Sequence, residues 1–138
     1  MDEQPLSVVL FSGTDDRLNA AAVMIAGAAA LGRPVHVFLQ YWALASFKAG
    51  HVESPRQLAP EAGPDGARSF AELQQAGQQH WSETLRMAKE IGEVDIQACT
   101  LSMDLLKLEQ ADLDSLVDGV EGVTAFYVNA GTGQLLFI

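Results

Sequence analysis

The stretch that decides the fold is residues 7–39, SVVLFSGTDDRLNAAAVMIAGAAALGRPVHVFL. It begins with a short apolar, β-prone run at 7–11 and closes with a second one at 34–39. Such runs are typical of strands buried inside a parallel sheet. The alanine-rich segment between them begins at Asp15 and Asp16 and stops at Gly32, residue types that suit the start and the end of a helix. We therefore predict a right-handed βαβ unit.

The rest of the chain continues this alternation. We expect strands at 94–99 and 134–138, and helices at 42–49, 69–91 (with a break near Gly77), 100–106 and 113–117; residues 123–128 fit either a strand or a helix. This pattern predicts an α/β domain with a parallel sheet covered on both faces. Ligands of such sheets bind outside the carboxyl ends of the strands, where residues 12–15, 40–42 and 99–102 would meet.

Residues 51–68 differ in composition from the segments around them. They contain Pro55, Pro60, Gly63, Pro64 and Gly66, which argue against a regular helix or strand. A connection of this length is typically a functional lid or an insertion. We therefore predict a flexible loop or lid at 51–68.

Composition indicates one globular domain over residues 1–138. Hydrophobic residues make up 49% of the chain and charged residues only 19%, which supports a packed core. The formal net charge is −10, and such a surface repels phosphate backbones. We expect no nucleic-acid partner.

The cysteine count, the first residues and the apolar runs indicate the cellular compartment of the protein. The chain has one cysteine, which excludes an internal disulfide and fits a reducing compartment. The acidic start, MDEQP, lacks the basic region of a signal peptide. The longest apolar run, residues 20–31, is too short to span a bilayer. We expect a cytoplasmic protein with no membrane partner.

The single thiol, Cys99, is the first candidate for chemistry. It is predicted at the last position of a strand, with a helix beginning at Thr100 or Leu101. The free N–H groups and positive dipole end of a helix start favour a thiolate, which is the nucleophilic form. A buried cysteine that only fills space is an equally valid interpretation of this position. The residues alone leave both interpretations open.

Other residues at the predicted strand ends are candidates for substrate binding. Ser12, Gly13 and Thr14 form a small turn whose N–H groups would suit the wall of a pocket around a sulfur anion. Trp42 would shield a reactive sulfur from water, although core or subunit packing explains it equally well. Thr100 and Ser102 flank the thiol on the predicted helix.

Metal-binding and hydrolase patterns are missing from the sequence. There is no CxxC pair and no paired-histidine motif, so we expect no metal site. No GxSxG elbow or P-loop is present either. Of the histidines, His36 is predicted to be a core residue, His51 an exposed loop residue, and His80 a surface or interface residue.

Several segments together resemble the DsrE/DsrF-like sulfur-relay proteins. Residues 38–44, FLQYWAL, resemble the family's F-x-x-[FY]-W-x-L segment, and residues 98–104, ACTLSMD, resemble A-C-x-[ML]-S-M-D. Residues 117–121, VDGVE, resemble the downstream D-G-V-E stretch, and SGTD at 12–15 is also similar. The resemblance extends over nearly the whole chain, and the cysteine and tryptophan segments in combination make it specific.

The resemblance implies a flavodoxin-like three-layer α/β/α fold with a mainly parallel sheet of about five strands. It implies that Cys99 carries sulfane sulfur as a persulfide, so that the protein acts as a sulfur carrier or sulfurtransferase without a cofactor. It also implies homo-oligomers, for which we expect a trimer or hexamer. The implied partners are a rhodanese-like donor, a TusA-like carrier and, in sulfur oxidation, a heterodisulfide-reductase-like complex.

Two other functions compete with sulfur relay. A one-cysteine thiol peroxidase needs a donor that stabilises the peroxide, usually an arginine, yet no arginine lies within ten residues of Cys99. A non-catalytic oligomeric binding module would engage a basic partner through the acidic surface, and its thiol would be inaccessible to small alkylating reagents.

Overall fold

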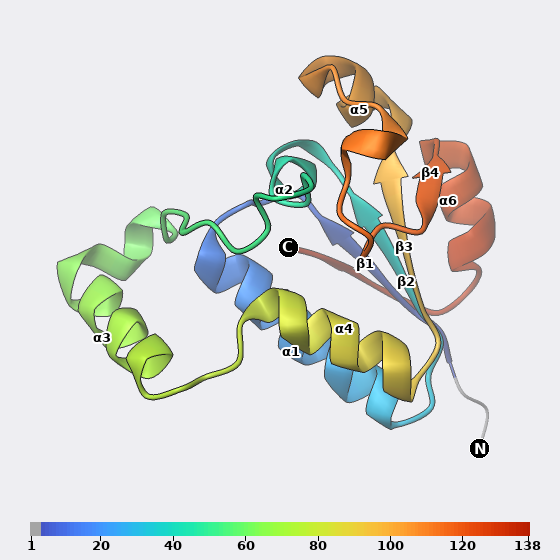
Figure 1. Cartoon of the computed structure of the whole chain (residues 1–138). Coiled ribbons are helices and arrows are strands. Elements are labelled where there is room, and N and C mark those ends of the chain that lie inside the picture. Colours follow the sequence, from blue (N-terminus) through green and yellow to red (C-terminus); the bar gives the residue numbers. More distant parts are fainter. Residues whose placement is uncertain (1–3) are drawn as a thin grey trace.

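A computed structural model describes residues 4–138. It contains one five-stranded sheet in the order β4-β3-β2-β1-β5, and every neighbouring pair of strands is parallel (Figure 1). The strands are β1 (Leu6–Leu10), β2 (Val35–Leu39), β3 (Val94–Cys99), β4 (Gly119–Glu121) and β5 (Gln134–Phe137).

Helices cover the sheet unequally. They are α1 (Asp15–Ala30), α2 (Tyr41–Ala45), α3 (Gly63–Gln75), α4 (Trp81–Ile91), α5 (Thr100–Leu106) and α6 (Val123–Ala130), with short 3-10 turns η1 (Pro60–Ala62) and η2 (Gln110–Asp112). The long helices α1 and α4 lie side by side over one face, while the short α6 lies over the other; α3 stands away from the sheet (Figure 1). The result is the predicted three-layer α/β/α architecture.

The face under α1 and α4 holds the main core. Alternate strand residues such as Val8, Val37 and Ile96 point to this side and are fully buried against Ile25 of α1 and Leu85 of α4. Burying side chains of this size contributes roughly 1.5–3 kcal/mol each. This apolar layer fixes the sheet and therefore the positions of the strand ends.

The predicted βαβ unit is confirmed. The strands and the helix at 7–39 form as β1, α1 and β2, with bounds shifted by about one residue, and Gly32 ends the helix with a positive φ of 79°. The strand at 94–99 and the helix at 100–106 are correct to the residue. The ambiguous segment 123–128 lies within helix α6.

The interpretation of 51–68 as lacking regular structure is correct for residues 51–59, which form no helix or strand, and wrong for residues 60–68. Turn η1 and the first six residues of α3 lie inside it. Gly63 begins α3 with a φ of +63°, a value that glycine adopts without strain. Pro64 occupies the first helical turn, where the missing N–H has no intrahelical acceptor to lose. These residues therefore start a helix instead of preventing one.

Three smaller expectations also need correction. The helix predicted at 113–117 does not form; the Asp112 carboxylate accepts the Glu109 N–H within η2, and Leu113 instead forms an antiparallel bridge with Lys48. The helix predicted at 42–49 covers only Tyr41–Ala45. The three-residue strand β4 was not predicted, since it is too short to leave a clear pattern.

In the part of the chain that the structure describes, no helix has the length and apolar character needed to cross a membrane.

Candidate functional site

Cys99 lies where the sequence predicts it. It is the last residue of β3 and the cap residue before α5, at the carboxyl edge of the sheet. In the ladder between β3 and β4 it stands opposite Glu121. The thiol therefore lies at the edge where ligands of parallel α/β sheets bind.

The thiol is nevertheless covered. Cys99 is only 4% exposed and belongs to a small buried cluster with Val9, Phe38, Phe126 and Ala130. Two members of this cluster, Phe126 and Ala130, come from α6. Alternation along β3 thus turns Cys99 away from the main core and toward the face that α6 covers. The thiol therefore lies in a small apolar cluster between the sheet and α6.

The three predicted segments do meet at the carboxyl edge. The Ala43 N–H donates to the Phe11 carbonyl at 3.0 Å, which joins the ends of β1 and β2. The Tyr41 N–H donates to Ser102 Oγ at 2.9 Å, which joins the end of β2 to α5. Gly13 lies so close to Trp42 that an added Cβ would come within 2.4 Å of the Trp42 carbonyl oxygen. Only glycine fits at this position without moving the backbone.

The predicted substrate-binding residues separate into two groups. Ser12, Gly13, Thr14 and Trp42 line a pocket of about 530 Å³, which we call the edge pocket; Phe11, Arg17, Arg56 and Gln57 complete its lining. Cys99 is not among these lining residues. Ser102 is fully buried and holds the Tyr41 backbone, whereas Thr100 is exposed. The structure thus brings the turn and the tryptophan together in one pocket and leaves the thiol outside it.

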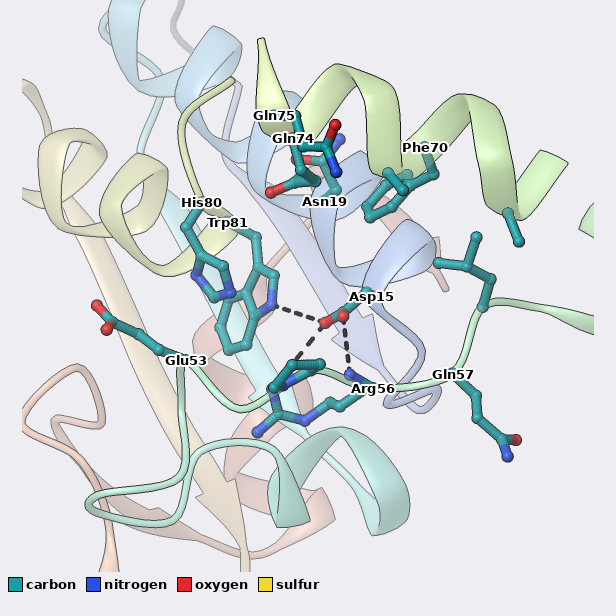
Figure 2. Close-up of a pocket in the computed structure, with 14 residues that line it drawn as sticks. Asp15, Asn19, Glu53, Arg56, Gln57, Phe70, Gln74, Gln75, His80 and Trp81 are labelled. Carbon is teal, nitrogen blue, oxygen red and sulfur yellow. Dashed lines mark hydrogen bonds and ion pairs between the residues drawn. The ribbon is translucent and has the colours of Figure 1, made fainter. Parts of the chain in front are cut away.

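A second pocket, of about 580 Å³, lies between α3 and the body of the protein (Figure 2). At its base the Asp15 carboxylate accepts the Arg56 N–H at 2.9 Å and faces Trp81 Nε1 at 3.4 Å. The Arg56 guanidinium lies 5.7 Å from the centre of the Trp81 ring. Phe70 of α3 contributes to the opposite wall (Figure 2). This network fixes the segment around Arg56 to the start of α1.

Two ionisable groups near α1 have shifted pKa values. Burial lowers the pKa of Arg56, and neighbouring Asp15 partly opposes that change. Burial alone would raise the pKa of Asp16, but hydrogen bonds with the Thr14 side chain and with the Ala59 and Arg17 backbones outweigh it, so the pKa of Asp16 is lowered. Both groups hold residues 56–59 against the start of α1.

His36 is the buried, hydrogen-bonded core residue that the sequence predicts. Its Nδ1 lies 2.9 Å from Asp95 Oδ2 and its Nε2 lies 2.5 Å from Glu121 Oε1. Its ring stacks on Phe126 of α6, with 5.5 Å between the ring centres. No group of three or more potential ligands is arranged to hold a metal ion within residues 4–138.

Sequence reasoning missed the roles of Arg17, Arg56 and Glu121. Arg56 lay in the segment interpreted as a loop, and no spacing pattern connects it to Asp15 or Trp81. Glu121 belongs to the D-G-V-E stretch, in which nothing indicates a contact with His36. Its place beside Cys99 depends on the pairing of β3 with β4, a strand that was not predicted.

The fold defines the class of protein. The crystal structure of YchN from E. coli matches with a TM-score of 0.57, covering 97% of this chain and 99% of the YchN chain at 13% sequence identity. A likeness at that identity shows the fold alone, and the fold is the DsrE-like, flavodoxin-like α/β/α fold.

A relative identifies the family more closely. The uncharacterized protein YrkE of Bacillus subtilis (strain 168) is 32% identical over 157 residues, covering 96% of this chain and 95% of YrkE. The chain belongs to the same family as YrkE. No protein-family model matches it.

Proposed function

We propose that this DsrE-like protein is a sulfur carrier that holds sulfane sulfur as a persulfide on Cys99. The Cys99 thiolate attacks the outer sulfur of a donor persulfide; the new S–S bond forms as the donor's S–S bond breaks, and the donor leaves as a thiolate. An acceptor thiolate then attacks the outer sulfur of the Cys99 persulfide and regenerates the Cys99 thiolate. Atoms and electrons balance in both steps without a cofactor.

One observation carries this proposal: the only thiol of the chain stands at the carboxyl edge of a DsrE-like fold, at the junction of β3 and α5. In parallel α/β sheets this edge is where chemistry is placed. The hydrogen bonds that join the ends of β1 and β2 and tie β2 to α5 give the junction a fixed frame. A cytoplasmic setting and thiol-bearing partners such as a rhodanese-like donor and a TusA-like carrier belong to the same proposal.

Intact-mass analysis tests the proposal directly. After incubation with polysulfide or thiosulfate, the protein is expected to gain the mass of one sulfur atom, and a small thiol is expected to remove it. Cys99→Ser is the matched control and should gain nothing. Absence of the adduct, or an adduct that persists in Cys99→Ser, contradicts the proposal.

The burial of Cys99 favours a second candidate, a binding module in which the thiol has no chemical role. A thiol that reacts with alkylating reagents only after global unfolding supports this candidate against sulfur relay. The peroxidase alternative gains no support from the site, since Arg17 and Arg56 line pockets to which Cys99 does not contribute.

We also propose that the protein forms homo-oligomers, a trimer or hexamer, through the open edge of β5. Leu135 and Phe137 are exposed on this strand, which lies at one edge of the sheet. Exposed apolar residues beside an open strand edge favour pairing with a second copy of the chain.

Light scattering with size-exclusion chromatography tests the oligomer. Leu135→Asp is expected to convert a micromolar oligomer into a monomer. Leu31→Asp, which changes another exposed leucine just after α1, is the matched control and should leave the mass unchanged. A wild-type protein that is monomeric at micromolar concentration contradicts this part of the proposal.

A further inference from the structure

A row of charged side chains lies on the α6 side of the sheet. His36 on β2 is paired with Asp95 on β3 in the ladder, and its second ring nitrogen reaches Glu121 on β4. A neutral imidazole has one N–H and one acceptor nitrogen, whereas an ionised carboxylate only accepts. Each ring nitrogen of His36 therefore has a carboxylate group as its partner. The Glu121 side chain is only 8% exposed, so its charge depends on these partners.

Helix α6 is attached to this row by few contacts. Phe126 stacks on Phe38, with 4.7 Å between ring centres, and on His36. Asn129 donates from Nδ2 to the second carboxylate oxygen of Glu121 at 2.8 Å. Of the eight residues of α6, only Phe126 and Ala130 are buried. The helix is therefore a thin cover, and Glu121 links it to the sheet.

The same cover closes over the thiol. Phe126 and Ala130 complete the buried cluster around Cys99, and Glu121 stands opposite Cys99 in the β3–β4 ladder. Glycines flank α6 at both ends, with Gly122 as its N-cap and Gly131 following it with a φ of +63°. Segments held by few buried contacts open at lower free energy than the core of a domain does. Opening of α6 would expose Cys99 while the layer under α1 and α4 stays packed.

We propose that Glu121 is a positioning residue that holds α6 closed over Cys99, through its ion pair with His36 and its hydrogen bond from Asn129, and so sets access to the thiol. This deepens the proposed function, because a buried sulfur carrier needs a way to present its sulfur. The closure of α6 is measured by the access of reagents to Cys99 and does not depend on sulfur transfer.

The groups that determine the charge of this row come from every element packed around it. Asp95 on β3 and Glu121 on β4 face His36, β1 contributes the neutral Ser7 at the paired position, and α6 contributes Phe126 and the amide of Asn129. The Ser7 hydroxyl is buried and has no hydrogen-bond partner in the structure. Neither Phe126 nor Asn129 carries a charge. A charge introduced at position 129 therefore tests the contact between α6 and Glu121 directly.

Asn129→Asp is the decisive variant. Asn129 is exposed, and aspartate has nearly the same shape, so the core is not disturbed. The new carboxylate would face Glu121, replacing a donated hydrogen bond with a like-charge contact. The readout is the rate of reaction of Cys99 with 4,4′-dithiodipyridine, relative to the urea-unfolded protein at the same pH. The rate at pH 7 is expected to rise roughly tenfold, the effect of losing one hydrogen bond to a charged group.

An exchanged pair separates this role from general loosening. In the double variant Glu121→Gln, Asn129→Asp the amide lies on β4 and the carboxylate on α6, so a hydrogen bond can form again and the rate should fall below that of Asn129→Asp. Glu121→Gln, which keeps an acceptor for Asn129 but loses the charge that pairs with His36, should raise the rate at pH 7 by a smaller factor. Asp118→Asn is the matched control: Asp118 precedes β4 and pairs with Lys89, away from α6, so thiol reactivity should not change.

The outcomes are distinct. Unchanged thiol reactivity in Asn129→Asp, or an equal rise in Asp118→Asn, overturns the role of Glu121. Faster reaction in Asn129→Asp without any sulfur adduct on the wild-type protein leaves the closure in place and removes the proposed function. A sulfur adduct on the wild-type protein with unchanged thiol reactivity in Asn129→Asp removes the role of Glu121 and leaves the proposed function in place.

Discussion

The two faces of the sheet are built differently. The face under α1 and α4 is covered by two long helices and packed with apolar side chains. The face under α6 is covered by one short helix and contains His36, Asp95, Glu121 and the only thiol. One face thus carries most of the buried apolar area, while the other combines polar side chains with the thiol. A thin cover over polar groups can open without loss of the fold.

The largest expected effect comes from weakening the apolar face. Ile25 is completely buried between α1 and the sheet. Ile25→Ala is expected to lower the free energy of unfolding by about 3–4 kcal/mol, from lost transfer energy and the cavity left behind. Urea denaturation measures it. Thiol reactivity in the absence of denaturant should change far less than for Asn129→Asp. A loss below about 1 kcal/mol would contradict the assignment of stability to this face.

A smaller effect is expected from the polar face. His36→Leu leaves the Glu121 side chain, which is only 8% exposed, without its His36 partner, and we expect a loss of about 2–3 kcal/mol at pH 7. Urea denaturation again gives the value. The double variant His36→Leu, Glu121→Leu should recover part of the loss, since an apolar pair leaves no unpaired charge. No recovery in the double variant would show that the ion pair is not the cause.

The sequence predicts the apolar face better than the polar one. Residues 7–39 and 94–106 were assigned nearly to the residue, because buried parallel strands and their glycine-terminated helices have strong local patterns. The location of the candidate site at the carboxyl edge of the sheet was inferred from topology alone. The chain does bring residues 12–15, 40–42 and 99–102 together there. Thus the frame of the candidate site was predictable.

The composition of the site was not predictable in the same way. The contacts of His36 span three strands, and their register is not readable from one sequence. Strand β4, which carries Glu121, has only three residues. The second half of α3 and the break near Gly77 were predicted, but its first six residues were missed. Gly63 and Pro64 were interpreted as helix breakers, although they occupy positions where a helix accepts them. Side-chain contacts between distant segments decide these features.

The smallest expected effect on stability comes from the carboxyl edge of the sheet, at the start of α1. The Asp16 carboxylate at the start of α1 accepts the Ala59 N–H at 3.1 Å and so holds the segment that leads into α3. Asp16→Ala should cost about 0.5–1 kcal/mol at pH 7, because the carboxylate is partly solvated and its hydrogen bonds are correspondingly weak. Urea denaturation of the variant beside the wild type measures this difference.

The pH dependence of that difference has a definite sign. Since the pKa of Asp16 is lowered in the folded protein, its contribution is fully present above the unfolded value of about 3.9 and is lost as the pH falls through the folded value. Wild type and Asp16→Ala should therefore differ by a constant amount above about pH 5 and converge as the pH falls through the folded value. Asp65→Ala, which removes an exposed pair with Arg68 on α3, should match the wild type at every pH. A difference for Asp16→Ala that stays unchanged down to the lowest pH at which the protein is folded would mean that the Asp16 side chain acts through packing and not through its charge.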